Sequence, residues 1–157
     1  MKNELKQELT RRLCECNNGG LVLVMYDIYF AFSEDVKNAL SDNDRAALKK
    51  GVGDVQAALD ELIGALDFSY PVASQLYPLY SYCKRLFSTA LYGKNASAVD
   101  EADSIMCKLR DSFEVAAKQD KSGPVMGNAQ KVYAGMTYGR TTLTENCIDD
   151  DHRGFLA

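Results

Sequence analysis

The segment GLVLVMYDIYFAFSEDVKNAL, residues 20–40, decides the fold class of this chain. An apolar stripe runs along it at steps of three or four residues, the spacing of one helical face. The stripe consists of Leu21, Met25, Ile28, Phe32, Val36 and Leu40. Further apolar residues lie off this stripe in the first half of the segment. The pattern therefore predicts a long helix whose first half is buried on both sides, either inside the domain or under a partner.

A second helical segment is expected over residues 44–66. It follows a run of short polar side chains that begins at Ser41 and suits a helix N-cap. Leu59 lies in the middle of its apolar stripe and is expected in the core. Each of the three glycines inside the segment weakens a helix by about 1 kcal/mol relative to alanine. This helix is therefore expected to depend on tertiary packing.

A third helical segment is expected over residues 71–92, with Gly93 well placed as its C-terminal stop. Pro78 falls inside this segment. Because proline removes an N–H donor and crowds the preceding turn, the regular helix is expected to begin near residues 74–75 or to kink there.

A fourth segment is expected to begin after residues 95–97 and to end near Asp120. Ser97 and Asp100 resemble a capping box at its start. Leu109 lies in the middle of its apolar stripe and is expected in the core. A short additional helix is expected at the N-terminus, over residues 2–14.

Together these segments predict an all-α fold. Four amphipathic helices of about 20 residues, joined by short loops, indicate an antiparallel up-and-down four-helix bundle with a short extra N-terminal helix. We expect a bundle domain over residues 1–120 and an extended C-terminal tail over residues 121–157, rich in glycine, threonine and asparagine. The tail also carries scattered apolar residues, so we expect it to cover part of an apolar surface.

The composition argues against several classes of function. A formal net charge of −4 makes nucleic-acid binding improbable, because phosphate neutralisation needs clustered lysine and arginine. The longest apolar run, residues 21–26, is far shorter than the ~20 residues that span a bilayer, so neither membrane insertion nor a secretion signal is expected. The sequence contains none of the common glycine-rich nucleotide-binding motifs.

The five cysteines and the single histidine argue against an enzyme or a metal protein. Cys14 and Cys16 have no second Cys or His pair nearby, so no metal or other cofactor is expected, and an odd number of thiols suits a reduced cytoplasm. A rival hypothesis is a small helical enzyme with Cys83 or Cys107 as its nucleophile. It is disfavoured because the only histidine, His152, lies outside the expected bundle.

Three stretches carry spaced patterns that lie in a characteristic order. The first is Leu21-Val-Leu-Val-Met-Tyr-Asp27. The second and most specific covers residues 62–86 and has the form L-x-x-x-LD, then A-x-x-L-x-x-LY-x-Y-x-x-x-x-L. The third covers residues 105–113 and ends in LR-x-x-F. In order and spacing, the three stretches resemble the motifs of the flagellar secretion chaperones of the FliS family.

The sequence departs from the family pattern at a few positions. Gln75 replaces a frequent asparagine, Phe113 a frequent tryptophan, and Ile28 a glycine. The family usually has a tyrosine-containing N-terminal arm, whereas no tyrosine precedes Tyr26 here. Contacts with the flagellar export gate that are attributed to that arm are therefore in doubt.

The resemblance implies a cytoplasmic export chaperone that binds the disordered C-terminal region of flagellin. Binding would prevent premature polymerisation of flagellin and assist flagellar type III secretion. The export gate is a further implied partner, and a weak homodimer stays open. The alternative is a self-associating structural or regulatory helical bundle without chaperone activity.

Apolar and aromatic residues of the first and third long segments are the candidates for partner binding. Tyrosine suits a wet apolar groove, because its ring adds contact area while its hydroxyl tolerates water. The candidates are Leu21, Met25, Tyr26, Tyr29, Leu76, Tyr77, Leu79, Tyr80 and Leu86. The alternative for these tyrosines is a half-buried place in the bundle. Asp27, the one acid in an apolar run, is either an exposed helix position or a polar anchor for the flagellin backbone.

Overall fold

The computed structural model describes residues 3–125, which form five helices and contain no strand. The helices are α1 (Asn3–Glu15), α2 (Asn18–Ser41), α3 (Arg45–Gly64), α4 (Pro71–Gly93) and α5 (Ala96–Ala117). The predicted all-α fold is confirmed for this part of the chain, and so is the short N-terminal helix. The predicted tail begins at residue 121, and from residue 126 onward it lies outside the described residues.

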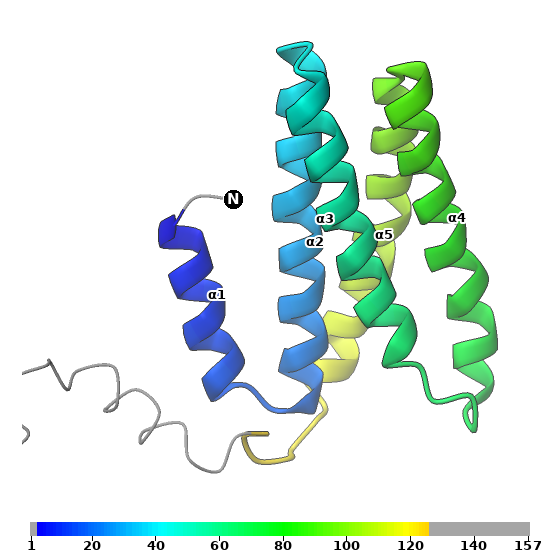
Figure 1. Cartoon of the computed structure of the whole chain (residues 1–157). Helices are drawn as coiled ribbons and strands as arrows, with labels where there is room; N and C mark the ends of the chain where they lie inside the picture. The colour runs from blue at the N-terminus through cyan, green and yellow to red at the C-terminus, as the bar shows by residue number, and fades with distance from the viewer. Residues whose placement is uncertain (1–2, 126–157) are drawn as a thin grey trace, which may run out of the picture. The chain divides into compact units, whose positions relative to one another are not determined.

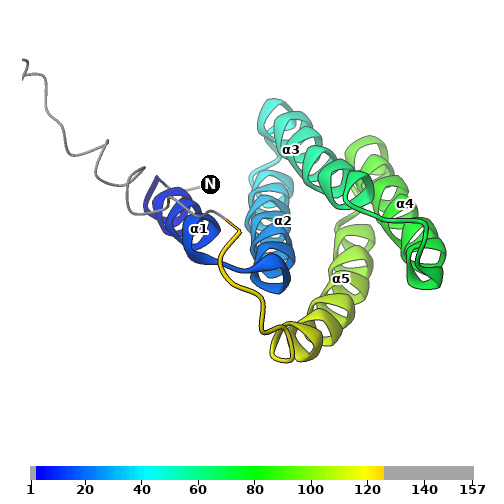
Figure 2. The ribbon, with the colours of Figure 1, turned by 90° about the horizontal axis from the view of Figure 1, so that it is seen from below.

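Helices α2 to α5 pack side by side. α2 packs against α3 and α5, and α4 packs against the same two helices. Successive helices run in opposite directions in Figure 1, while α1 stands beside α2 and packs against it. Figure 2 shows the same arrangement from below. α2 thus has three neighbours, and both Val24 and Tyr26 on its opposite faces are buried, as its apolar first half predicted.

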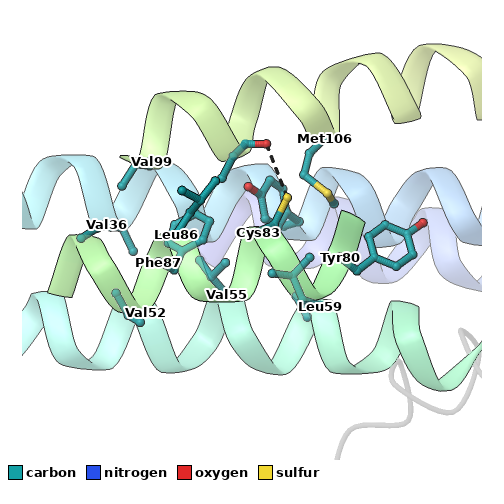
Figure 3. Close-up of a cluster of buried hydrophobic side chains, with 14 of the residues drawn as sticks. Val36, Val52, Val55, Leu59, Tyr80, Cys83, Leu86, Phe87, Val99 and Met106 are labelled. Carbon is teal, nitrogen blue, oxygen red and sulfur yellow. Dashed lines mark hydrogen bonds between the residues drawn. The ribbon is translucent and has the colours of Figure 1, made fainter. Parts of the chain in front are cut away.

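The core is built from side chains of all four long helices (Figure 3). The Phe87 ring stands edge-on to the Tyr29 ring, with 5.9 Å between the centroids and 89° between the planes. Leu59 is completely buried, as predicted, whereas Leu109 is only partly buried and packs against the edge of the core. Complete burial of one such side chain contributes about 1.5–3 kcal/mol, so this core supplies much of the force that holds the helices together.

The helix N-termini confirm one predicted cap and correct another. Asp44, within the predicted polar run, caps α3, and its Oδ1 accepts hydrogen bonds from two backbone N–H groups of the first turn at 2.9 and 3.0 Å. The capping box predicted for Ser97 and Asp100 is wrong. Asn95 caps α5 instead, because its Oδ1 accepts both the backbone N–H and the hydroxyl of Ser97, at 3.0 and 2.7 Å. These two bonds draw Ser97 into the first helical turn.

α4 covers the predicted segment and ends at Gly93, as expected. It is helical from Pro71 onward and continues through Pro78, so the expected start of the regular helix near residues 74–75 is wrong, while the alternative of a kink there stays a prediction. Proline is tolerated at the first helical position, where an N–H would have no intrahelical partner. Pro78 is exposed, so water can solvate the carbonyl group that loses its hydrogen bond. Gly93 is the last helical residue, and Lys94 adopts the left-handed conformation after it, with φ of 49°.

Candidate partner-binding surface

One end of the bundle is formed by the α3–α4 connection, residues 65–70, and the last turns of α5, and we call it the open end. In the connection, Asp67 Oδ1 accepts a hydrogen bond from the backbone N–H of Ser69 at 2.9 Å. This bond lowers the pKa of the Asp67 carboxyl and folds the connection into a compact turn. The turn leaves the Phe68 and Tyr70 rings exposed to solvent.

A pocket of about 180 Å³ lies at the open end, and we call it the end pocket. Its lining is almost entirely apolar and comes from α2, α3, the α3–α4 connection, α4 and α5. Its walls include Val22, Leu62, Leu66, Leu76, Tyr80 and Phe113. Pockets for drug-sized ligands are typically about 300–1,000 Å³. The end pocket is therefore suited to one or two side chains of a partner rather than to a small-molecule substrate.

Exposed apolar side chains gather at the open end, where Tyr70 and Val72 line the end pocket and Tyr77 lines a separate hollow between α3 and α4. Of the nine large apolar side chains that are exposed within the described residues, five lie between residues 68 and 79. They are Phe68, Tyr70, Val72, Tyr77 and Leu79. The rings of Phe68 and Tyr77 contact each other, with centroids 6.1 Å apart. These five residues and the end pocket form the open-end surface, and such concentrated exposure is typical of an interaction site.

Four of the nine predicted partner-binding residues belong to this surface or lie directly beneath it. Tyr77 is 47% exposed and Leu79 is 37% exposed. Leu76 and Tyr80 line the end pocket but are themselves almost completely buried.

Three other predicted residues lie elsewhere. Leu21 and Met25 are half-buried on α2, and Met25 packs against the core. Leu86 is buried within the core cluster. Its assignment to a partner-binding surface is therefore corrected, since its side chain is already covered by neighbouring helices.

Tyr26, Tyr29 and Tyr80 also correct the prediction of solvent-facing tyrosines, because each is at most 1% exposed. The hydroxyl oxygens of Tyr26 and Tyr80 lie 2.7 Å apart. The Tyr29 hydroxyl donates a hydrogen bond to Asp103 Oδ1 at 3.0 Å. Burial raises the pKa of all three phenols. Since these hydroxyls find partners inside the protein, their rings can be core residues.

Sequence reasoning missed the contribution of the α3–α4 connection. Phe68 and Tyr70 are exposed there, Val72 is exposed in the first turn of α4, and Phe113 forms the α5 wall of the end pocket. The available signal was the stretch DFSYPV, residues 67–72, in which two aromatic rings stand just before a proline. Aromatic residues in a turn have no helical face that would place them in the core, so an exposed position was foreseeable.

Two other hollows of the described chain are more polar. One of about 270 Å³ beside the α2–α3 turn has four aspartates in its lining, and one of about 460 Å³ between α3 and α4 lies beside the Lys84–Asp60 ion pair. Within residues 3–125, no group of three or more His, Cys, Asp or Glu side chains is placed to hold a metal ion. No helix in that range is long and apolar enough to cross a membrane.

Cys83 does not have the environment of a catalytic nucleophile. It is buried, its thiol donates a weak hydrogen bond to the Ala102 carbonyl oxygen, and burial raises its pKa to about 12. A reactive cysteine needs a lowered pKa and some exposure. Cys107 is exposed on α5, and His152 lies outside the described residues.

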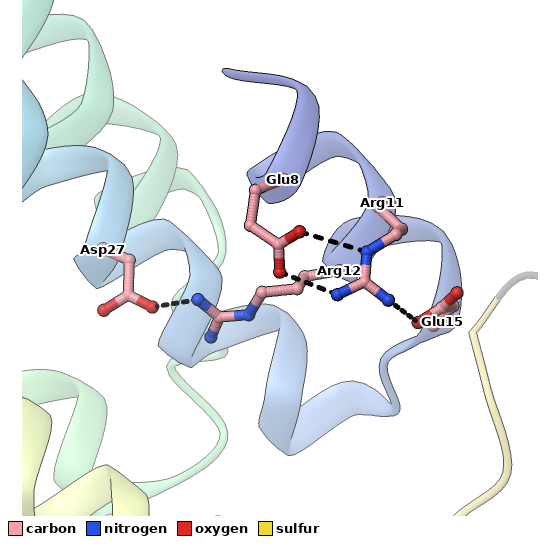
Figure 4. A network of polar contacts seen from close by, with 5 residues as sticks. All are labelled: Glu8, Arg11, Arg12, Glu15 and Asp27. Atoms are coloured by element: carbon pink, nitrogen blue, oxygen red, sulfur yellow. Dashed lines mark hydrogen bonds and ion pairs between the residues drawn. The ribbon is translucent and has the colours of Figure 1, made fainter. Parts of the chain in front are cut away.

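Asp27 occupies neither of the environments expected for it. Its side chain is only 18% exposed, and its two carboxylate oxygens are held by different helices. Arg12 of α1 contacts Oδ2 at 2.7 Å (Figure 4), and Arg110 of α5 contacts Oδ1 at 3.0 Å. Asp27 therefore links three helices and is not free to anchor a partner backbone.

Fold and surface together define a small helical bundle with an exposed apolar end. A family model described as flagellar protein FliS matches residues 1–120 of the chain. The chain therefore belongs to the FliS family of flagellar proteins, and this membership gives it a flagellar chaperone role in general terms. No individually curated protein matches the sequence.

Proposed function

We propose that this protein is a cytoplasmic, non-enzymatic export chaperone that binds the C-terminal disordered region of flagellin. Bound flagellin cannot polymerise before export, so the chaperone assists flagellar type III secretion. In this proposal, residues 1–120 act as an antiparallel four-helix bundle with α1 added outside, and residues 121–157 are a tail. The function needs no cofactor, nucleic acid or membrane insertion.

The open-end surface is the observation that carries this proposal. An amphipathic helix is recognised by apolar side chains at i, i+3 and i+4, which enter an apolar groove or pocket. The end pocket has room for such an anchor, and the exposed side chains of Tyr70 and Val72 form part of its lining. A flagellin segment that is disordered when free would gain helix on binding and lose part of the interaction energy to ordering.

The second candidate function is self-association through the same surface, because exposed aromatic rings also suit a contact between two copies. Sedimentation of the free protein, with and without a flagellin C-terminal peptide, separates the two. A chaperone is expected to be largely monomeric and to form a complex with the peptide. A dimer that ignores the peptide supports the alternative. The export gate stays a possible further partner, with its contact site unassigned.

Two exposed tyrosines on one helix provide a matched test of the flagellin-binding proposal. Tyr77 lies on the open-end surface, whereas Tyr92 is 85% exposed at the other end of α4, about 22 Å away at 1.5 Å per residue. Tyr77→Ala is expected to weaken binding of the peptide by roughly tenfold or more, as for a contact residue. Tyr92→Ala is expected to leave binding unchanged.

Calorimetry gives the affinities, and circular dichroism of the mixture minus its components gives the added helix. Additive spectra together with no heat of binding would refute the proposed function. Equal loss in the two variants would instead refute the open-end surface as the site.

A further inference from the structure

The last turns of α5 are poorly anchored by apolar packing. The buried residues of α5 are Ala98, Val99, Ala102 and Met106, yet the helix continues to Ala117. Beyond Met106, Leu109 and Phe113 are only partly buried, and Val115 is exposed. Polar contacts therefore add to this packing in setting the position of this part of the helix.

A half-buried ion pair supplies one of these contacts. Arg110 Nε donates to Asp27 Oδ1 at 3.0 Å, and the arginine side chain is 34% exposed. Charges that are partly removed from water attract each other more strongly than exposed ones, although added salt still weakens them. Arg12 takes the other oxygen of the same carboxylate, so Asp27 holds α1 and α5 by separate atoms.

The same ion pair lies next to the wall of the end pocket. Phe113 follows Arg110 by three residues, so the two side chains project from neighbouring positions on α5. The Phe113 ring lines the end pocket and contacts the ring of Tyr26, with 5.6 Å between the centroids. Tyr26 in turn precedes Asp27 on α2. A shift of α5 away from Asp27 would therefore move one wall of the pocket.

A second contact holds the far end of α5. The carboxylate of Asp120 accepts a hydrogen bond from the backbone N–H of Gly19 at 3.0 Å, at the start of α2. The side-chain amide of Asn17 donates to the Asp120 carbonyl oxygen at 3.3 Å. Phe113 thus lies between two contacts that hold α5 against α2, the one of Arg110 before it and the one of Asp120 after it.

We propose that Asp27 is a positioning residue of the open-end surface. Its pairing with Arg110 holds the last turns of α5 so that Phe113 closes one side of the end pocket in the shape that takes a partner side chain. Arg12 shares the carboxylate but fastens α1 and has no part in shaping the pocket. This inference rests on the proposed function only for the identity of the partner, because the pocket geometry can be measured without it.

The test uses a reporter in the pocket wall. The chain contains no tryptophan, so Phe113→Trp introduces a single fluorophore at that position. In this background we compare Asp27→Asn and Arg110→Gln with the matched control Arg12→Gln. The first two are expected to shift the emission to longer wavelengths, because the reporter becomes more exposed to water. Arg12→Gln is expected to leave the emission unchanged.

The same three substitutions in the chain with Phe113 intact are then tested for binding of the flagellin C-terminal peptide. Asp27→Asn and Arg110→Gln are expected to weaken binding by roughly three- to tenfold, the size expected for a half-exposed charged contact. Arg12→Gln is expected to change it by less than roughly twofold. Unchanged emission in Asp27→Asn, or an equal effect of Arg12→Gln, would overturn the assignment.

A salt titration covers the case in which Asp27→Asn does not fold. Sodium chloride added to the reporter protein with Asp27 intact is expected to shift its emission to longer wavelengths, while far-UV circular dichroism stays unchanged. Emission that is insensitive to salt would contradict the role of the ion pair. If the wild-type protein binds no flagellin peptide, the proposed function fails, yet the emission data still decide whether Asp27 shapes the pocket.

Discussion

The two ends of the helical bundle differ in the connections that join their helices. At the closed end, α2 joins α3 through residues 42–44 and α4 joins α5 through residues 94–95. Asn43 and Lys94 both adopt the left-handed conformation there, and Lys94 Nζ donates to Asn43 Oδ1 at 2.6 Å. At the open end, the connection of residues 65–70 is longer and carries exposed aromatic rings.

The hollows at the two ends differ in chemistry. At the closed end, a hollow of about 270 Å³ beside the α2–α3 turn has four aspartates in its lining, and the space between the two turns is about 10 Å³. At the open end, the pocket of about 180 Å³ is almost entirely apolar. The difference indicates that the closed end serves stability and that the open end retains apolar surface for a partner.

The largest expected effect separates two phenylalanines. Phe87 is completely buried, whereas Phe68 is 59% exposed on the open-end surface. Phe87→Ala is expected to lower the free energy of unfolding by about 3–5 kcal/mol, because it leaves a cavity in the core. Phe68→Ala is expected to change it by less than about 0.5 kcal/mol while weakening peptide binding. Urea unfolding measures both, and similar losses in the two variants would refute the contrast between the ends.

The second expected effect concerns the contact between α2 and the end of α5. A Cβ atom at Gly19 would lie 2.9 Å from the backbone Cα of Ala117, whereas one at Gly53 would meet nothing within 4 Å. Gly19→Ala is therefore expected to cost about 1–3 kcal/mol through overpacking. Gly53→Ala is expected to gain about 1 kcal/mol from helix propensity. Thermal unfolding of the pair checks this, and a gain in both variants would mean that α5 is not held tightly at Gly19.

The smallest expected effect is a loss of stability at alkaline pH. Burial raises the pKa of Cys83 to about 12 from an ordinary 9.0, and it raises the pKa values of Tyr26, Tyr29 and Tyr80 above 10.0. A group whose pKa is higher in the folded than in the unfolded chain stabilises the fold at pH values below its unfolded pKa. This stabilisation is lost as the pH rises toward the folded pKa. The free energy of unfolding is expected to stay level from pH 7 to about 9 and to fall by about 1–2 kcal/mol at pH 10.

Cys83→Ala provides the control for the alkaline effect, because it removes the group that titrates first in the unfolded chain. The fall between pH 9 and 10 is expected to become shallower in this variant. A wild-type stability that stays flat up to pH 10 would show that these groups are less buried than the structure has them.

Much of the fold was predictable because helix spacing and caps depend on neighbouring residues. The stripe through Leu59 and the polar run that ends at Asp44 both predicted α3 correctly. Failures occurred where two local signals competed. Asn95 and Ser97 are both residue types that cap helices well. Which of them accepts from the free N–H groups depends on the residue at which the helix begins, and that is Ala96. Pro78 breaks an isolated helix more readily than one that is held by packing on its other face.

The candidate site was less predictable than the fold. Tyr77 and Leu79 are exposed, as a partner-binding residue must be, whereas Tyr26, Tyr29 and Tyr80, which the sequence did not distinguish from them, are buried. Periodicity alone does not separate a ring in the core from a ring beside it when a helix has more apolar positions than one face can hold.

The sequence by itself determined that this chain forms long amphipathic helices and that its motifs resemble the FliS family, because both depend on residue types at fixed local spacing. Only the tertiary structure decided which apolar residues remain exposed. Phe68 and Tyr77 stay at the surface and Tyr29 does not, because α2 is covered by three neighbouring helices while the start of α4 lies at an end that no described helix closes. Burial depends on contacts between segments far apart along the chain, such as Tyr26 with Tyr80 and Asp27 with Arg110.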